Sequence, residues 1–140
     1  MKLAYIASLA AVLGVCVPCS RAEQEAPPAK PTNVIFSAPL QDIPGKNLVV
    51  VALELQPHAK HASLPHRHPG SVYVYVTRGA AKLGIEGQPV QEVHTGQSFF
   101  EPPGVLHTVA ESASDTETAA AIAVMVVPAG APLLTVEPHH

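Results

Sequence analysis

Turn-forming residues divide this chain into short segments, and this division limits its fold more than any other feature. The 140 residues include fifteen prolines and nine glycines, and the proline share is about twice the usual one. Proline lacks a backbone N–H and clashes with the preceding helical turn, so prolines this widely spread leave little room for long helices. The proline distribution therefore argues against a helical bundle. The apolar share of 47% excludes disorder of the whole chain.

The segments between these turns show the two-residue alternation of β-strands. Over residues 48–56 the side chains on the two faces of an extended chain differ, and the apolar–polar alternation is clearest at the C-terminal end of the segment. Residues 72–77, VYVYVT, place the valines on one face and the tyrosines on the other. Residues 116–127 begin with alanines that favour helix, but their valines favour a strand, which we predict. Further strands are expected at residues 34–37, 82–86, 90–94, 97–101 and 106–110. Many short strands at even spacing predict an all-β sandwich or barrel.

The first residues have the pattern of a secretory signal peptide. Lys2 precedes an apolar run over residues 3–17, and small residues flank Arg21 in Ser20-Arg21-Ala22. A positive start, a short apolar run and small residues at the cleavage site predict cleavage near Ala22. The run is shorter than the roughly 20 residues of a membrane span. We therefore expect a periplasmic or secreted protein with no stable membrane span.

Removal of residues 1–22 would also remove both cysteines, Cys16 and Cys19. The mature chain would then contain no disulfide and no thiolate ligand or nucleophile. Lipidation at Cys16 is the alternative, although Gly14 and Val15 fit a lipoprotein signal poorly.

Behind the signal peptide we expect an extended leader and first strand over residues 23–44. The domain follows over residues 45–130, and a C-terminal tail over residues 131–140. Eight Lys and Arg against eleven Asp and Glu provide no basic surface for nucleic acid.

Histidine is unusually frequent, with eight copies. In Pro65-His66-Arg67-His68-Pro69 the two histidines are two residues apart, so an extended chain directs both to one side. Two imidazoles so placed can bind one metal ion. The same pattern also fits an exposed polar loop. The remaining histidines are expected to be exposed: His58, His61, His94, His139 and His140.

Together with a second segment, Gly96 to His107, this pattern resembles the cupin superfamily. The resemblance covers about residues 45–128 and rests on two motifs, which supply His66, His68 and Gly79, then Gly96, Pro102, Gly104 and His107. It implies a double-stranded β-helix, the cupin jelly-roll barrel, with His66, His68 and His107 as ligands of one divalent metal ion. The chain departs from the motifs at Val72, where the family's usual glutamate ligand stands, and at Glu111, where an asparagine stands.

The loss of that glutamate changes what the implied site would bind. Three neutral imidazoles leave the ion its full charge and open coordination positions, which favours a small anionic, chelating ligand. The site resembles the three-histidine iron sites of some cupin dioxygenases and the three-histidine zinc of a hydratase or hydrolase. Iron and zinc are therefore expected first, and manganese, nickel and copper also remain, because imidazole suits several of these metals.

Glu101 is the candidate to replace the lost carboxylate. If residues 97–101 and 107–110 pair as an antiparallel hairpin, Glu101 lies opposite His107 and faces the same side. It could then bind the metal, orient His107 or act as a general base. The alternative is an exposed charge at a strand end.

These observations predict an exported single-domain cupin, a metal-dependent enzyme of the dioxygenase or hydrolase/hydratase type acting on a small anionic metabolite. The alternative is a non-catalytic module that binds a metal or small ligand, and a third reading is a barrel with a vestigial site. A homodimer is also expected, from the apolar face that contains Tyr73 and Tyr75 and from family analogy.

Overall fold

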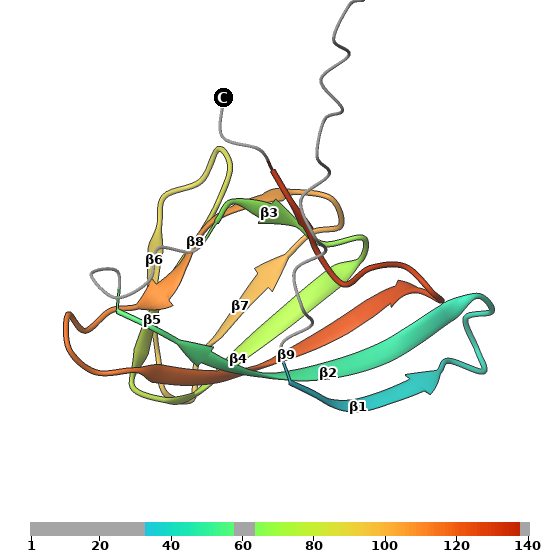
Figure 1. Ribbon diagram of the computed structural model, residues 1–140, viewed down its shortest axis with the longest axis horizontal. Coiled ribbons are helices and arrows are strands. Elements are labelled where there is room, and N and C mark those ends of the chain that lie inside the picture. Colours follow the sequence, from blue (N-terminus) through green and yellow to red (C-terminus); the bar gives the residue numbers. More distant parts are fainter. Residues whose placement is uncertain (1–32, 58–63, 138–140) are drawn as a thin grey trace, which may run out of the picture.

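The computed structural model describes residues 33–57 and 64–137, and within them the chain is built of antiparallel β-strands packed as two layers (Figure 1). The ten strands are β1 (Val34–Pro39), β2 (Lys46–Leu55), β3 (His66–Arg67), β4 (Ser71–Arg78), β5 (Ala80–Ile85), β6 (Gln91–His94), β7 (Ser98–Glu101), β8 (Leu106–Ser112), β9 (Ala119–Pro128) and β10 (Thr135–Val136). The predicted all-β class is confirmed.

Strands distant in sequence alternate between two five-stranded sheets, with the orders β1-β2-β9-β4-β7 and β10-β3-β8-β5-β6. Consecutive strands such as β3 and β4, or β7 and β8, lie in different sheets, which is the wrapping pattern of a jelly roll. The jelly-roll expectation is therefore confirmed. It takes the form of two facing sheets, because the described strands do not form one closed hydrogen-bonded barrel.

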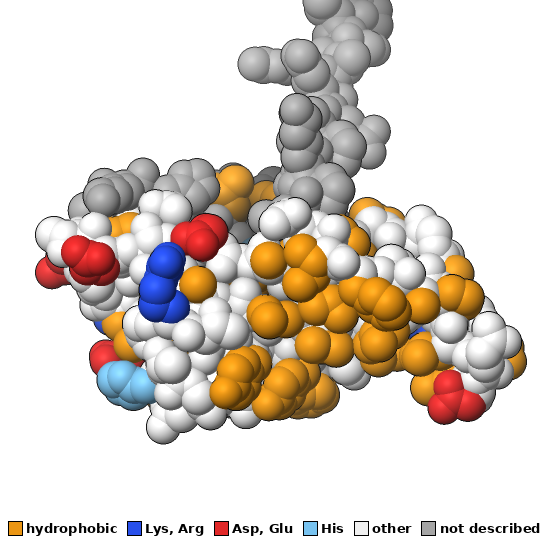
Figure 2. Space-filling view, turned by 90° about the horizontal axis from the view of Figure 1, so that it is seen from below, with side chains coloured by type: hydrophobic (Ala, Val, Ile, Leu, Met, Phe, Trp, Pro, Cys, Tyr) orange, Lys and Arg blue, Asp and Glu red, His pale blue; other side chains and the backbone are white. Residues whose placement is uncertain are grey.

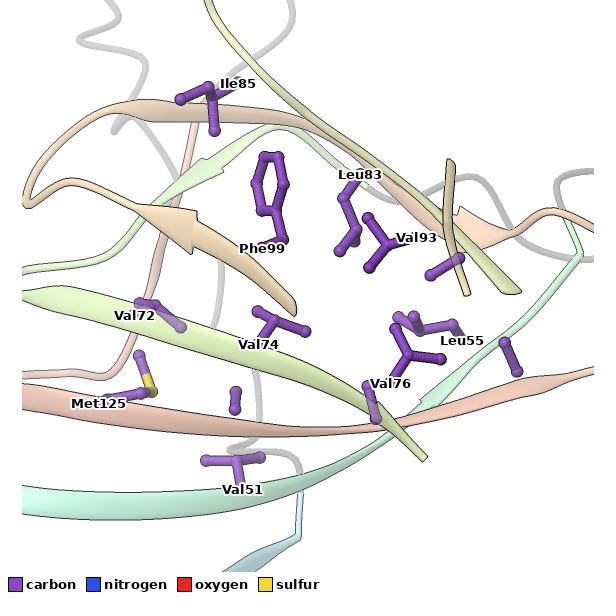
Figure 3. Close-up of a cluster of buried hydrophobic side chains, with 14 of the residues drawn as sticks. Val51, Leu55, Val72, Val74, Val76, Leu83, Ile85, Val93, Phe99 and Met125 are labelled. Atoms are coloured by element: carbon purple, nitrogen blue, oxygen red, sulfur yellow. The ribbon is translucent and has the colours of Figure 1, made fainter. Parts of the chain in front are cut away.

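Alternation along the strands builds the core between the layers (Figure 3). In β4 the valines Val72, Val74 and Val76 are at most 2% exposed, while Tyr73 and Tyr75 are 45% and 40% exposed. The predicted division of this segment into a valine face and a tyrosine face is thus confirmed. The β9 strand alternates in the same way, so residues 119–128 form a strand over their whole length despite the alanines at their start. Its small inward side chains leave space for the opposite sheet.

The opposite face of the first sheet is also apolar. The strand register aligns Phe36 with Val50, Val50 with Val124, Val124 with Tyr73 and Tyr73 with Phe100. These five residues form a row across all five strands, which we call the outer row. Figure 2 shows apolar side chains gathered over this face as one area, with charged side chains toward its ends.

Several sequence predictions concern residues outside the described ranges. The signal peptide with its cleavage near Ala22, and Cys16 and Cys19, all precede residue 33. Within the described part of the chain there is no helix long and apolar enough to cross a membrane. The expected C-terminal tail does contain structure, because β10 lies within it and pairs with β3.

Candidate metal centre

Three histidines converge in the space between the sheets. His66 in β3 lies directly opposite His107 in β8, and His68 follows two residues after His66. The ring centroid of His66 lies 4.9 Å from that of His68 and 5.0 Å from that of His107. One ring nitrogen from each histidine lies within 4.8 Å of the others, so the described residues contain a cluster that could hold a metal ion.

The turn between His68 and β4 is sterically demanding. A Cβ atom at Gly70 would lie 1.9 Å from the carbonyl oxygen of Val126 in β9, so only glycine fits this crossing. The close approach lets the chain pass directly from the histidine pair in one sheet to β4 in the other.

Backbone carbonyls fix the orientation of two of the rings. The Nδ1 atom of His66 donates to the carbonyl oxygen of Leu64 at 2.8 Å, and that of His68 donates to Leu133 at 2.7 Å. Because a carbonyl only accepts, Nδ1 carries the proton in both rings and Nε2 keeps its lone pair. This is the arrangement in which metal-binding histidines are usually held.

The Leu133 contact could not have been found from sequence, since any residue supplies a carbonyl oxygen. It depends on the docking of β10, where Thr135 pairs with Arg67 and Val136 with His66. Arg67 strengthens this docking through Glu137, whose Oε1 accepts from its Nε at 2.7 Å.

Glu101 is buried at the same site, but the strand pairing that places it there differs from the predicted one. The predicted hairpin between residues 97–101 and 107–110 is wrong, because β7 pairs with β4 in one sheet while β8 pairs with β3 and β5 in the other. Glu101 instead lies directly opposite Val72 in β4, so its side chain shares the inward face of Val72. It is 2% exposed, and the exposed strand-end alternative is therefore also wrong.

The Glu101 carboxylate faces two of the histidines across the layers. Its Oε2 atom lies 3.3 Å from Nδ1 of His107 and 3.6 Å from Nε2 of His68. Among the described side chains, the buried polar atoms without a hydrogen-bond partner are this Oε2 and both ring nitrogens of His107. Burying such atoms unpaired is costly, so their concentration here indicates a ligand-binding role.

Burial dominates the electrostatics of these groups. It lowers the pKa of His107 to about 3, with further lowering by His66 and His68. Burial also lowers the pKa of His68, partly offset by the Leu133 hydrogen bond, and raises the pKa of Glu101 to about 7. The two histidines are therefore neutral at pH 7, the form that binds metal.

The histidines and Glu101 form the polar part of an otherwise apolar cavity of about 160 Å³. The remaining wall is aliphatic and comes from both sheets and from Leu133 and Leu134. An apolar cavity of roughly this size holds a benzene-sized molecule. The part of a ligand that enters this cavity would therefore be small.

The other histidines do not join the cluster. The side chain of His94 is 60% exposed, as expected. His58, His61, His139 and His140 lie outside the described residues. Glu111, at the asparagine position of the second motif, is buried in β8, and its side chain does not line the cavity.

Three solved structures of similar fold are distant from this chain in sequence. A double-stranded β-helix protein of Klebsiella pneumoniae is 20% identical with a TM-score of 0.52, and the match covers 76% of this chain and 82% of that one. A DMSP lyase of Ruegeria pomeroyi is 17% identical with a TM-score of 0.52, covering 66% of this chain. Oxalate decarboxylase of Bacillus subtilis is 20% identical with a TM-score of 0.54, covering 71% of this chain.

This chain spans only 43% of the lyase and 26% of the decarboxylase, so these matches show a shared fold and no more. No curated protein matches the sequence.

The two-sheet jelly roll and its inward-facing histidines together place this chain among small β-proteins with a candidate metal site. Residues 51–130 match the family described as the cupin domain. The chain belongs to the cupin family, and the resemblance predicted from its two motifs is confirmed.

Proposed function

We propose that this protein is an exported, single-domain, metal-dependent cupin enzyme that acts on a small anionic metabolite. The observation that carries the metal site is the convergence of His66, His68 and His107, with two of the rings held by carbonyl oxygens so that Nε2 is available. The unpaired ring nitrogens of His107 fit the same role, because a bound cation would satisfy one of them.

We expect iron or zinc first, and manganese, nickel and copper are further candidates, because imidazole binds several of these metals. When bound, a divalent ion supplies positive charge that polarises an anionic ligand, together with oxygen chemistry if it is iron or an activated water if it is zinc. The chain's own contribution is to hold the imidazoles, to exclude bulk water with the aliphatic wall, and to place the Glu101 carboxylate beside His68 and His107.

The size and lining of the cavity support a small substrate. About 160 Å³ admits a short-chain or single-ring molecule, whose charge would face the histidines and whose carbon skeleton would face the aliphatic side chains. Reactions of the dioxygenase type and of the hydrolase or hydratase type both fit this arrangement. A lyase and a decarboxylase share this fold, so the fold is compatible with an enzymatic role.

Elemental analysis of the purified, tag-free protein tests this proposal. We expect about one equivalent of metal in the wild type, and none in a His66→Ala/His68→Ala variant, with His94→Ala as the matched control that keeps its metal. Iron would direct substrate screening to oxygen uptake, and zinc to hydrolysis or hydration. Metal without turnover of any small anion would favour the binding module, and no metal after reconstitution would overturn the proposal.

The proposal includes a homodimer formed through the outer row. Its three aromatic members, Phe36, Tyr73 and Phe100, are 51%, 45% and 56% exposed. The row is uncharged, so two copies can approach without repulsion, and a two-fold interface uses the same surface of both partners. We expect a dimer in sedimentation velocity, a monomer for Phe100→Asp, and a dimer for the control Val90→Asp. A monomeric wild type at high concentration would contradict this.

Export also belongs to the proposal, supported by the pattern of residues 1–22. Expression of the full chain followed by N-terminal sequencing should find a product in the periplasm or medium that begins near Glu23. An intact, cytoplasmic chain would contradict export, and a lipid at Cys16 would replace secretion by anchoring.

A further inference from the structure

Val72 and Glu101 form a pair that the sequence motifs do not reveal. The two residues face each other in the antiparallel register of β4 and β7, and both are almost fully buried, at 1% and 2% exposed. Directly opposed side chains have Cβ atoms about 4.5–5.5 Å apart and point to the same face. A carboxylate on β7 therefore occupies nearly the same part of the cavity as a carboxylate at position 72 would.

The distances around this carboxylate match those between two ligands of one metal ion. Donor atoms bound at about 2.0–2.2 Å with angles between octahedral and tetrahedral lie roughly 2.8–3.6 Å apart. The Oε2 atom of Glu101 lies 3.3 Å from Nδ1 of His107 and 3.6 Å from Nε2 of His68. The latter is the nitrogen that the Leu133 hydrogen bond leaves available.

The same atoms lack partners within the protein. Oε2 faces Nδ1 of His107 at 3.3 Å, and in the part of the chain described here neither these two atoms nor Nε2 of His107 has a hydrogen-bond partner. A cation bound between them would satisfy the carboxylate and one imidazole nitrogen at once. A hydrogen bond between Glu101 and His107 alone would leave the position beside His68 unexplained.

We propose that Glu101 is the fourth protein ligand of the metal, so that the carboxylate missing at Val72 is supplied from the neighbouring strand. This inference rests on the proposed metal site. It makes the centre a three-histidine, one-carboxylate site and reduces the charge of the loaded centre from +2 to +1. It also means that the position of the carboxylate, and not its presence, distinguishes this chain from the motif it resembles.

The first test compares metal affinities of the full-length protein by competition with a zinc chelator. Glu101→Gln keeps the shape of the side chain, and its amide oxygen can still accept a hydrogen bond from Nδ1 of His107. We expect at least 100-fold weaker zinc binding in Glu101→Gln, because a neutral amide is a poor metal ligand. Glu92→Gln is the matched control, since Glu92 also lies beside a histidine, His94, but on the surface. It should bind zinc as the wild type does.

The second test moves the carboxylate back across the strand pair. In the double variant Val72→Glu/Glu101→Val, the same two side chains exchange places, and we expect zinc affinity within tenfold of the wild type. Cobalt absorption spectra provide a readout that does not depend on this variant folding. Glu101→Gln should alter the visible bands of the cobalt-loaded protein, and Glu92→Gln should leave them unchanged.

The outcomes separate this inference from the proposed function. A wild type that binds no metal overturns both. A wild type that binds zinc while Glu101→Gln binds it within a few-fold, with an unaltered cobalt spectrum, overturns only the fourth ligand and assigns Glu101 to positioning His107. A folded double variant that stays as weak as Glu101→Gln also overturns it.

Discussion

Two glutamate–histidine pairs in this molecule have nearly the same separation and entirely different surroundings. Glu101 and His107 lie 3.3 Å apart with side chains 2% and 4% exposed, whereas Glu92 and His94 lie 3.5 Å apart with side chains 52% and 60% exposed. The exposed pair is surrounded by water, which screens its charges and solvates every polar atom. The buried pair is shielded from water, and Oε2 of Glu101 and both ring nitrogens of His107 lack hydrogen-bond partners.

This comparison shows that distance alone does not define a site. The buried pair lies beside two further histidines whose rings are held by backbone carbonyls, and burial shifts the pKa values of both its members. The exposed pair has no such neighbours among the described residues. Convergence and burial together, rather than a glutamate near a histidine, indicate ligand binding.

The largest expected difference between the two pairs is in metal affinity. Removing the imidazole in His107→Ala deletes one of three converging ligands, and we expect affinity for zinc or iron to fall by more than about 100-fold, beyond the usual effect of a residue that only orients a ligand. His94→Ala should change affinity less than twofold. Isothermal titration calorimetry of both variants checks this, and equal affinities would remove the distinction between the pairs.

A smaller effect is expected from loosening the support of His68. Glu137→Ala removes the 2.7 Å ion pair with Arg67 and weakens the docking of β10, which holds the Leu133 carbonyl. Because this pair is partly exposed, it contributes at most about 1 kcal/mol. We expect metal affinity to fall by no more than about fivefold, the equivalent of about 1 kcal/mol, measured by chelator competition. Glu54→Ala, which breaks the exposed pair with Arg78, is the control and should have no effect.

The smallest expected effect is in the pH dependence of metal-free stability. Burial raises the pKa of Glu101 to about 7, so the folded state keeps a proton that the unfolded chain releases near pH 4.5. The stability of the wild type relative to Glu101→Gln should therefore fall as the pH rises from about 4.5 to 7, and then level off.

Thermal unfolding in the presence of a chelator measures this difference. The contribution of His107, whose lowered pKa costs stability as the pH falls from 6.5 toward 3, is common to both proteins. Glu92→Gln should follow the wild type at every pH. If the difference in stability between the wild type and Glu101→Gln did not change with pH, the Glu101 carboxylate would be solvated, like that of Glu92.

Much of the fold could be predicted because its information is local. The alternation in residues 72–77 predicted which side chains of β4 face the core, and the spacing of His66 and His68 predicted that both face one side. The family resemblance carried by the two motifs predicted that His107 lies beside these histidines. The failed hairpin between residues 97–101 and 107–110 marks the limit, because short strands connected by a turn can pair with each other or cross to the opposite sheet.

The sequence by itself determined the strand content, the inward faces and the three histidines, since period-two patterning and turn residues act within a few residues of one another. Only the tertiary structure decided that Glu101 lies across from Val72, that the carbonyl of Leu133 holds His68, and that an apolar row spans the outer face. Each of these depends on strand register between segments far apart in the chain. Register is set by the packing of two whole sheets, and no short stretch of sequence contains it.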